Sequence, residues 1–224
     1  MKTPIENAVR ELQSRFNASS PTPAMSQTFG KLAQALTGLE ALRQSRSPLE
    51  TREAHQTRTM RAAAKLSDQL SRLKSDAGQA YANSVVQAEA RISEAARLVP
   101  SEFAAEIRQA FRQMTPGERT NALADIVKSG DGPTLAALRD SPKLLHGMDA
   151  SILQRVIQQH AQAAAPAELA ALQSAKDAMD VFSALATTAQ RRAHECQDQR
   201  LLAEIEAADQ AAREATATFE AALA

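Results

Sequence analysis

The sequence predicts an all-α protein: a long antiparallel helical hairpin, or coiled coil, with a small compact multi-helix insert at one end. Hydrophobic residues make up 44% of the 224 residues, but aromatic residues only 3%, and tryptophan is absent. Two stretches of about 50 residues are almost free of glycine and proline and carry apolar residues at alternating spacings of three and four. Between these stretches, frequent prolines and glycines predict a run of short helices.

The first segment, residues 1–23, is predicted to be an amphipathic helix followed by a Ser/Pro linker. Thr3–Glu6 combines a capping threonine, a proline at the first helical position and a glutamate three residues after the cap. The linker is expected at residues 17–23. The helix either folds back onto its own bundle or docks on another protein. Its apolar stripe consists of Ile5, Val9, Leu12 and Phe16.

The second segment, residues 24–99, is predicted to hold one helix over Ser26–Arg43 and one long helix after it. Ser47–Glu50 again combines a serine, a proline and a glutamate in the spacing of a helix start. No proline follows until Pro100, so the long helix is expected to have about 50 residues and a length of roughly 75 Å. Its predicted seam consists of Met60, Ala63, Leu66, Leu70, Leu73, Ala77, Tyr81, Val85, Ala88, Ile92, Ala95 and Val99.

The third segment, residues 100–165, is predicted to be the compact insert of short helices. Helix starts are expected at Ser101, Thr115, Ser141 and Asp149, and a tight turn at Gly130–Pro133. The first of these helices carries the densest aromatic stretch of the chain, and its apolar face is formed by Phe103, Ile107, Phe111 and Met114.

The fourth segment, residues 166–224, has no glycine, and no proline after Pro166, so we expect a second helix of more than about 50 residues. Each long helix needs a partner to cover its seam, and the two are expected to pair with each other. The same pattern also allows pairing between chains. The predicted seam consists of Leu169, Leu172, Met179, Phe182, Ala186, Ala189, Ala193, Cys196, Leu202, Ile205, Ala212, Ala215 and Phe219.

The sequence predicts no catalytic residue, no cofactor-binding residue and no metal ligand. The four histidines are far apart and are expected on solvated helix surfaces, and the single cysteine, Cys196, is expected to be a small core residue. Twenty-six basic residues balance 26 acidic ones, which argues against a nucleic-acid-binding protein. No apolar run is long enough to cross a membrane, and no secretory signal is visible, so we expect a mature chain made in a cytoplasm.

A series of turn and cap residues in the insert lies in Pro100–Arg108, Met114–Arg119, Gly130–Leu138, Ser141–Pro142 and Leu145–Met148. In this series the insert resembles a pattern in poorly characterised α-helical coiled-coil proteins encoded among the head and tail genes of tailed bacteriophages. This resemblance covers about a fifth of the chain and implies a long coiled-coil segment on each side of the insert. It carries no functional residue, because its matching positions are turn and cap residues.

Two hypotheses for function follow. The first is a non-enzymatic structural or assembly protein of a phage particle (neck, tail, internal or scaffolding component), which acts through helix-mediated contacts with other virion proteins. It implies location in the virion and several copies in a larger complex. The second is a bacterial secreted or secretion-associated coiled-coil protein, similar to a type III substrate, with a disordered N-terminus. The interface candidates are Ile5, Val9, Leu12, Phe16, Phe103, Ile107 and Phe111.

Overall fold

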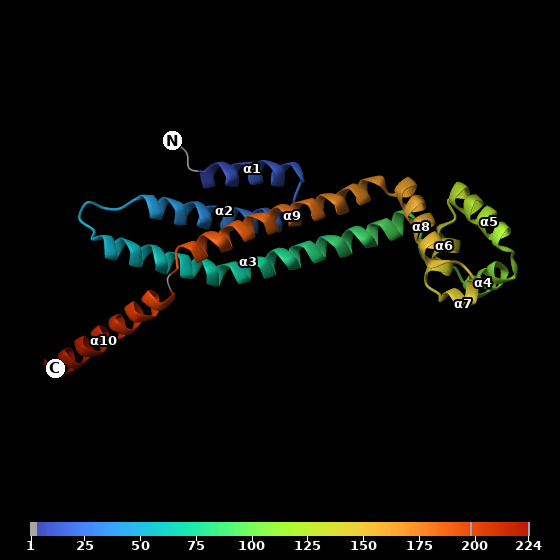
Figure 1. Cartoon of the computed structure of the whole chain (residues 1–224). Helices are drawn as coiled ribbons and strands as arrows, with labels where there is room; N and C mark the ends of the chain where they lie inside the picture. Colours follow the sequence, from blue (N-terminus) through green and yellow to red (C-terminus); the bar gives the residue numbers. More distant parts are fainter. Residues whose placement is uncertain (1–3, 198, 224) are drawn as a thin grey trace. The chain divides into compact units, whose positions relative to one another are not determined.

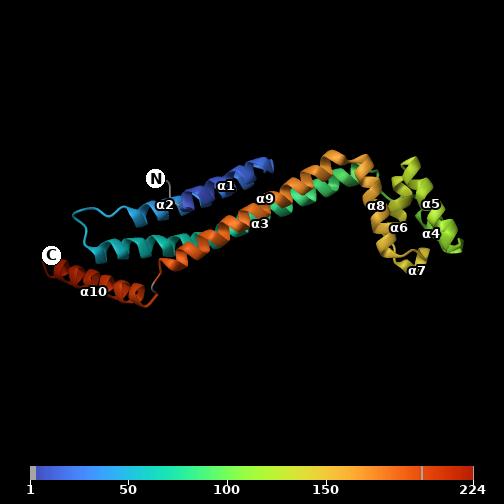
Figure 2. The ribbon, with the colours of Figure 1, turned by 45° about the horizontal axis from the view of Figure 1, so that its top comes forward.

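A computed structural model describes residues 4–197 and 199–223, and within them it contains ten helices and no strand, which confirms the all-α fold. The helices form two compact units (Figures 1 and 2). The first unit comprises residues 1–81 and 177–224, and the second comprises residues 82–176. Among the described residues, no helix is both long and apolar enough to cross a membrane.

In the first unit, α1 (Pro4–Ala18) packs against α2 (Pro23–Gln44). The rings of Phe16 and Phe29 stack with their centroids 4.1 Å apart, and both side chains are buried. The linker is shorter than predicted because α1 continues to Ala18 and Thr22 already caps α2. The hydroxyl of Thr22 accepts a hydrogen bond from the Met25 amide, directly before a proline at the first helical position.

The core of the first unit lies between α1, α2 and the parts of α3 (Arg52–Ala95) and α9 (Pro166–Glu195) that belong to this unit. Lys74 Nζ donates to Gln190 Oε1 over 2.9 Å, and Gln197 Nε2 donates to Ser67 Oγ over 3.2 Å. These pairs show that α3 and α9 run antiparallel here. The predicted seam is buried at Met60, Ala63, Leu66, Leu70, Ala77, Phe182, Ala186, Ala189 and Ala193.

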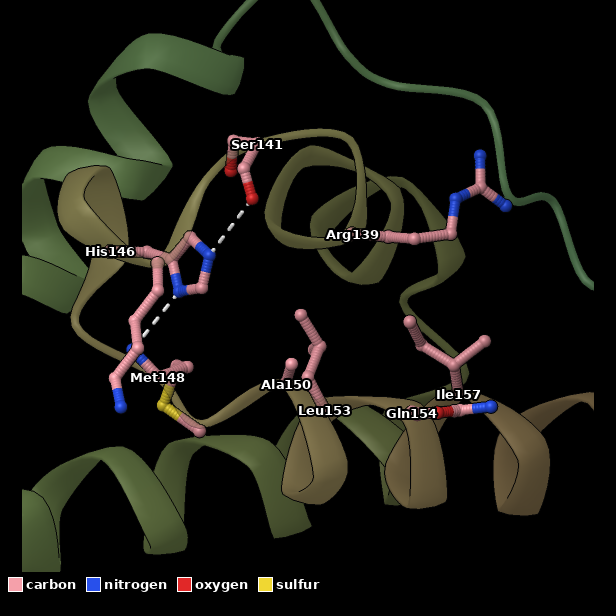
Figure 3. Close-up of a pocket in the computed structure, with 9 residues that line it drawn as sticks. Arg139, Ser141, His146, Met148, Ala150, Leu153, Gln154 and Ile157 are labelled. Carbon is pink, nitrogen blue, oxygen red and sulfur yellow. Dashed lines mark hydrogen bonds between the residues drawn. The ribbon is translucent and has the colours of Figure 1, made fainter.

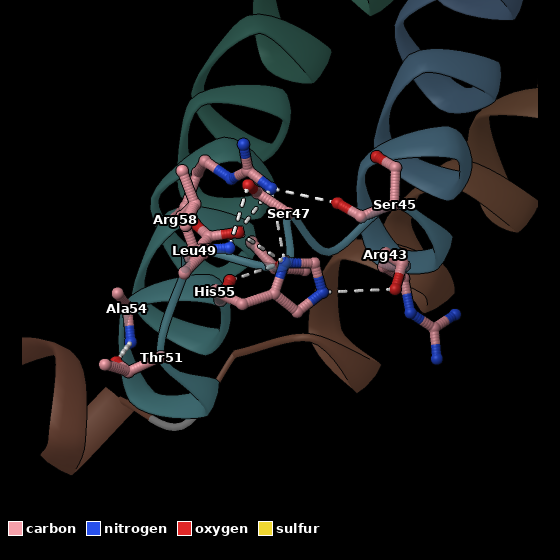
Figure 4. A network of polar contacts seen from close by, with 10 residues as sticks. Arg43, Ser45, Ser47, Leu49, Thr51, Ala54, His55 and Arg58 are labelled. Atoms are coloured by element: carbon pink, nitrogen blue, oxygen red, sulfur yellow. Dashed lines mark hydrogen bonds and ion pairs between the residues drawn. The ribbon is translucent and has the colours of Figure 1, made fainter.

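Helix α3 starts later than predicted. Thr51, rather than Ser47, caps it by accepting a hydrogen bond from the Ala54 amide over 3.1 Å. Glu50 instead accepts a hydrogen bond from Arg58 over 2.9 Å, and Arg58 also donates to the carbonyl oxygen of Ser45, as Figure 4 shows. Serine, proline and glutamate in this order therefore build the α2–α3 turn instead of a helix start.

Helix α3 also ends earlier than predicted, at Ala95 instead of residue 99. Arg97 has a φ of 51°, and the Leu98 amide donates back to the carbonyl oxygen of Ser93, the pattern of a helix stop that glycine usually provides. The stop shifts the register, so Leu98 is buried while the predicted seam residue Val99 is exposed.

The predicted single C-terminal helix is wrong. The chain forms α9, which ends at Glu195, and a separate helix α10 (Gln199–Leu223). The predicted seam is buried or half-buried from Leu169 to Cys196, but Ala212, Ala215 and Phe219 on α10 are exposed. No glycine or proline marks the end of α9, so the sequence pattern continues across it unchanged.

The second unit contains five short helices: α4 (Ala104–Gln113), α5 (Pro116–Ser129), α6 (Gly132–Arg139), α7 (Lys143–His146) and α8 (Ala150–Ala164). The predicted helix starts at Thr115 and Asp149 are confirmed. The starts predicted at Ser101 and Ser141 are wrong, because α4 begins after Phe103 and α7 after Pro142. The glycines at 130 and 147 end α5 and α7 with positive φ. Two apolar clusters form the core. The larger one consists of Ala96, Leu98, Phe111, Leu123, Leu135, Ala136, Leu138, Met148 and Leu153, and the smaller one of Ile92, Ala161 and Ala165.

Gly132 is required by a close backbone contact, which gives a first prediction. A Cβ atom at this position would collide with the carbonyl oxygen of Ala96 and lie 2.7 Å from that of Arg97. Backbone cannot move aside as a flexible side chain can, so Gly132→Ala should destabilise the second unit by roughly 1–3 kcal/mol. Hydrogen exchange of amides in α4–α8 would measure this change.

Gly117 is the matched control, because a Cβ atom there meets nothing within 4 Å. Gly117→Ala should leave the unit as stable as before or stabilise it by about 0.4–1 kcal/mol. Equal protection factors in the two variants would contradict the proposed role of Gly132.

The capping box of α5 gives a prediction about pH. The Thr115 amide and hydroxyl donate to Glu118 Oε2 over 2.7 Å and 2.8 Å, and these bonds, the amide first, lower the pKa of Glu118 below its ordinary 4.5. The stabilisation should therefore be fully present above about pH 4.5 and disappear as the pH falls through the lowered pKa. Glu118→Gln should lack this dependence.

Urea unfolding of both proteins between about pH 7 and pH 3 measures the effect. The stability difference between wild type and Glu118→Gln should be constant at neutral pH and shrink in acid. A difference that grows in acid would contradict the assignment.

Candidate protein-binding site

The second unit contains a cavity of about 310 Å³, hereafter the α7–α8 pocket. It lies where α6 ends, α7 forms a single turn and α8 begins (Figure 3). Leu153 and Ile157 project into it from one side of α8, and Met148 closes it from the preceding turn. The lining residues are Arg139, Ser141, Lys143, His146, Met148, Ala150, Leu153, Gln154 and Ile157.

His146 is a structural wall of this pocket. Its Nδ1 accepts a hydrogen bond from the Met148 amide over 3.0 Å, and its Nε2 lies 3.2 Å from the carbonyl oxygen of Ser141. A carbonyl oxygen can only accept, so Nε2 carries the proton and the ring is neutral. Both nitrogens are engaged and the side chain is buried, so His146 fixes the shape of the pocket rather than acting as a base or ligand.

The two cations beside the pocket are already neutralised. Arg139 Nε and Nη2 donate to the carboxylate of Asp140 over 2.6 Å and 3.0 Å, which raises the pKa of Arg139 and lowers that of Asp140. Lys143 Nζ lies 3.6 Å from Asp149 Oδ2. The pocket therefore offers an apolar floor with a charge-balanced rim, which suits an apolar side chain better than an anion.

Arg119 holds the turn that closes the pocket. Its Nε and Nη2 donate to the carbonyl oxygens of Phe111 and Arg112 at the end of α4, over 2.7 Å and 3.0 Å. Its Nη1 donates to the carbonyl oxygen of Gly147 over 2.7 Å, between His146 and Met148. One guanidinium thus joins α4, α5 and the α7–α8 turn, with its five donors in a fixed plane.

Three apolar residues that are sequence neighbours of the pocket-lining residues are exposed. Leu144 is 77% exposed, and Leu145 and Ile152 are exposed on the same two helices, α7 and α8. Successive residues of a helix point about 100° apart, so a one-turn helix cannot bury both of these adjacent leucines. An apolar pocket on helices with exposed leucine and isoleucine is typical of a protein-binding surface.

The structure places the predicted interface residues in two different settings. On α1, Ile5 and Phe16 are buried, and Val9 and Leu12 are partly buried against the same core, so α2 already covers this stripe. In the second unit, Phe111 is buried and Ile107 partly buried, and only Phe103 remains open, at 60% exposure. The pocket residues were not predicted, although the adjacent leucines at 144 and 145 were a usable signal.

Two histidines contradict the prediction of solvated surface positions. His146 and His160 are buried, and Nε2 of His160 donates to the carbonyl oxygen of Ala96 over 2.9 Å. His194 is exposed. Cys196 is half-buried, and burial raises the pKa of its thiol. Within the described residues, no three His, Cys, Asp or Glu side chains are grouped in a way that could hold a metal ion.

No protein family, curated protein or solved structure matches this chain.

The three bonds of Arg119 give a prediction for the pocket. Lysine has one small cationic group and cannot reach three carbonyl oxygens at once, so Arg119→Lys should destabilise the second unit by about 2 kcal/mol or more. The matched control is Arg112→Lys, whose side chain is exposed and which should change stability by less than about 0.5 kcal/mol. Denaturant unfolding measures both, and equal losses would contradict the role of Arg119.

Proposed function

We propose that this protein is a non-enzymatic structural or assembly protein of a tailed-bacteriophage particle that acts through helix-mediated protein contacts. The observation that carries the contact function is the α7–α8 pocket with its neutral rim and exposed Leu144. The phage assignment is supported by the resemblance of Pro100–Met148 to helical proteins from head and tail gene regions.

The partner of the pocket is expected to be another particle protein that inserts an apolar side chain. Arg139 and Lys143 are paired with carboxylates of their own chain, so a charged partner gains little there. The contact should therefore depend on apolar fit and change little with salt. In this proposal the protein is present in several copies, in the virion or in its assembly intermediates, after synthesis in the host cytoplasm.

A secreted, type III-like substrate receives less support. That hypothesis expects a disordered N-terminus, whereas residues 4–18 form α1 with Ile5 and Phe16 buried in the first unit. Export of a reporter fused to the first ~30 residues would favour this alternative and count against the phage assignment.

Particle composition tests the proposal. Purified particles from a host that supplies the tagged chain should contain it in a fixed ratio to the other structural proteins. Leu144→Asp should lower that ratio at least about tenfold, because a carboxylate cannot enter an apolar contact without a large desolvation cost. Quantitative mass spectrometry of the particles measures the ratio.

Leu49→Asp is the matched control, because Leu49 is 98% exposed and lies in the first unit. It should be incorporated like the wild type. If the wild-type chain is found in head precursors but not in particles, the protein is a scaffold. If it is absent from both, the phage assignment fails.

A further inference from the structure

The C-terminal helix α10 has an apolar stripe, and no described part of its own chain covers most of it. Every side chain that the structure describes from Ala207 to Ala221 is exposed, including Phe219 at 65%, and Ile205 is half-buried. The same spacing on α9 buries Ala186, Ala189 and Ala193. The stripe on α10 follows steps of three and four and consists of Ile205, Ala208, Ala212, Ala215 and Phe219.

Two hollows lie along α2 and α3 in the same unit, and together they are called the α2–α3 groove. The near section, which lies next to the α2–α3 turn, has a volume of about 690 Å³. It is lined by Leu42, Ala54, Thr57, Arg58, Arg61, Ala62, Lys65 and Ile205. The far section, about 590 Å³, is lined by Lys31, Gln34, Ala35, Gln69, Arg72, Leu73 and Asp76. Figure 1 shows α2 and α3 as an antiparallel pair. From the near to the far section, the numbers of the lining residues fall along α2 and rise along α3 at helical spacing, so both sections lie on one face of this pair.

The groove and α10 have complementary character. Half-buried Ala35, Ala62 and Leu73 lie along the floor of the groove, where small side chains allow a helix to approach closely. The rim of the far section carries two cations, Lys31 and Arg72, and one acid, Asp76. The C-terminal half of α10 carries two acids, Glu214 and Glu220, and one arginine, Arg213. The opposite signs favour α10 as the occupant over a basic or neutral helix.

The helix α10 of the same chain cannot fill the far section. Gln197 donates a hydrogen bond to Ser67, and Ile205 lies beside Arg58 and Arg61. The chain therefore runs antiparallel to α3 from Gln197 into α10. If this pairing continues, about residue 213 of α10 lies opposite the first residue of α3. The last two to three turns of α10 then extend beyond the N-terminal end of α3. The far section starts at Gln69, in the opposite direction along α3.

We propose that the far section of the α2–α3 groove binds the C-terminal half of α10 from a second copy of this chain. Ala215 and Phe219 pack on the floor formed by Ala35 and Leu73. The neighbouring carboxylates of Glu214 and Glu220 form ion pairs with Lys31 and Arg72 at the rim. The exchange is reciprocal, because each copy supplies one helix end and one groove, which gives a twofold dimer. The proposal rests on the proposed function only in taking protein contact as the role of the chain.

Pairing of α10 with another α10 is the competing arrangement, and its charges disfavour it. An antiparallel pair centred on Ala212 places Glu204 opposite Glu220 at both ends. A parallel pair sets two α10 helices side by side, and each of them carries five acids and two arginines. The groove offers the opposite charge at the same helical spacing.

Light scattering on a sizing column at about 10–200 µM tests the dimer. The wild type should dimerise with concentration, and more weakly at high salt. Phe219→Glu should raise the dissociation constant at least about tenfold. The matched control is Ala217→Glu, which places the same charge on the opposite face of α10 and should have little effect.

Charge reversal tests the groove. Lys31→Glu with Arg72→Glu should weaken the dimer, and adding Glu214→Lys with Glu220→Lys should restore it in part. Arg10→Glu, an exposed position on α1, is the control. Circular dichroism of each variant checks that the helices remain folded. A wild-type chain that stays monomeric over the whole concentration range would overturn the proposal.

Disulfide trapping identifies the contact in trans. In a Cys196→Ser background, one chain carries Ala215→Cys and a differently tagged chain carries Gln69→Cys. Oxidation of the mixture should link the two tags. If only Ala215→Cys chains link to each other, and reversal of Lys31 and Arg72 leaves the dimer intact, α10 pairs with itself and the proposal fails.

Failure here is distinguishable from failure of the proposed function, because the particle test changes Leu144 in the second unit. A chain that remains monomeric but enters particles in a Leu144-dependent way would overturn only the dimer. A chain that dimerises through α10 but enters neither particles nor precursors would overturn only the phage assignment.

Discussion

The first unit depends on close packing of alanine-rich helices around a few large side chains. Alanine favours the helix but contributes little apolar area, so helices with alanine seams must approach closely along narrow lines. The large side chains are concentrated where three helices meet: Phe16 of α1, Phe29 of α2 and Phe182 of α9 are all buried in one core. A phenylalanine in such a position buries 150–250 Å², so α1 is part of the stabilising core rather than an appendage.

The second unit is stabilised differently, because its short helices of 4 to 15 residues have many backbone N–H and C=O groups at their ends without a partner within the helix. Here polar side chains take the role that long seams have in the first unit. Arg119 binds three carbonyl oxygens from two segments, and His160 binds the carbonyl oxygen of Ala96. Gly132 then packs directly on the backbone of Ala96 and Arg97. The α7–α8 pocket depends on these contacts, since Arg119 and His146 fix the turn that closes it.

The sequence allowed the helical fold and several helix starts to be predicted, because caps and prolines act within one turn of the chain. Thr115 and Asp149 are examples, and the seams of α3 and α9 followed from periodicity. Other boundaries depend on the surroundings. Arg97 ends α3 with a backbone conformation that its residue type does not announce, and α9 ends without a glycine or proline. Burial of His146 and His160 was also not predictable, because their partners are backbone groups: the Ser141 carbonyl and the Met148 amide for His146, and the Ala96 carbonyl for His160.

The candidate surfaces show why apolar periodicity alone does not locate a binding site. The stripes on α1 and α10 have the same spacing, yet α2 covers the first and no described part of this chain covers most of the second. An apolar stripe in the sequence predicts that one face of a helix is buried in a contact. It does not predict whether the partner in that contact is another helix of the same chain or a different molecule. The charges then separate the two surfaces that remain. The cations at the α7–α8 pocket are paired with carboxylates beside them, whereas the rim of the far section of the α2–α3 groove carries two cations, Lys31 and Arg72, and one acid, Asp76. A contact at the pocket should therefore persist in high salt, while a contact in the groove should weaken, so ionic strength distinguishes the two even before a partner is known.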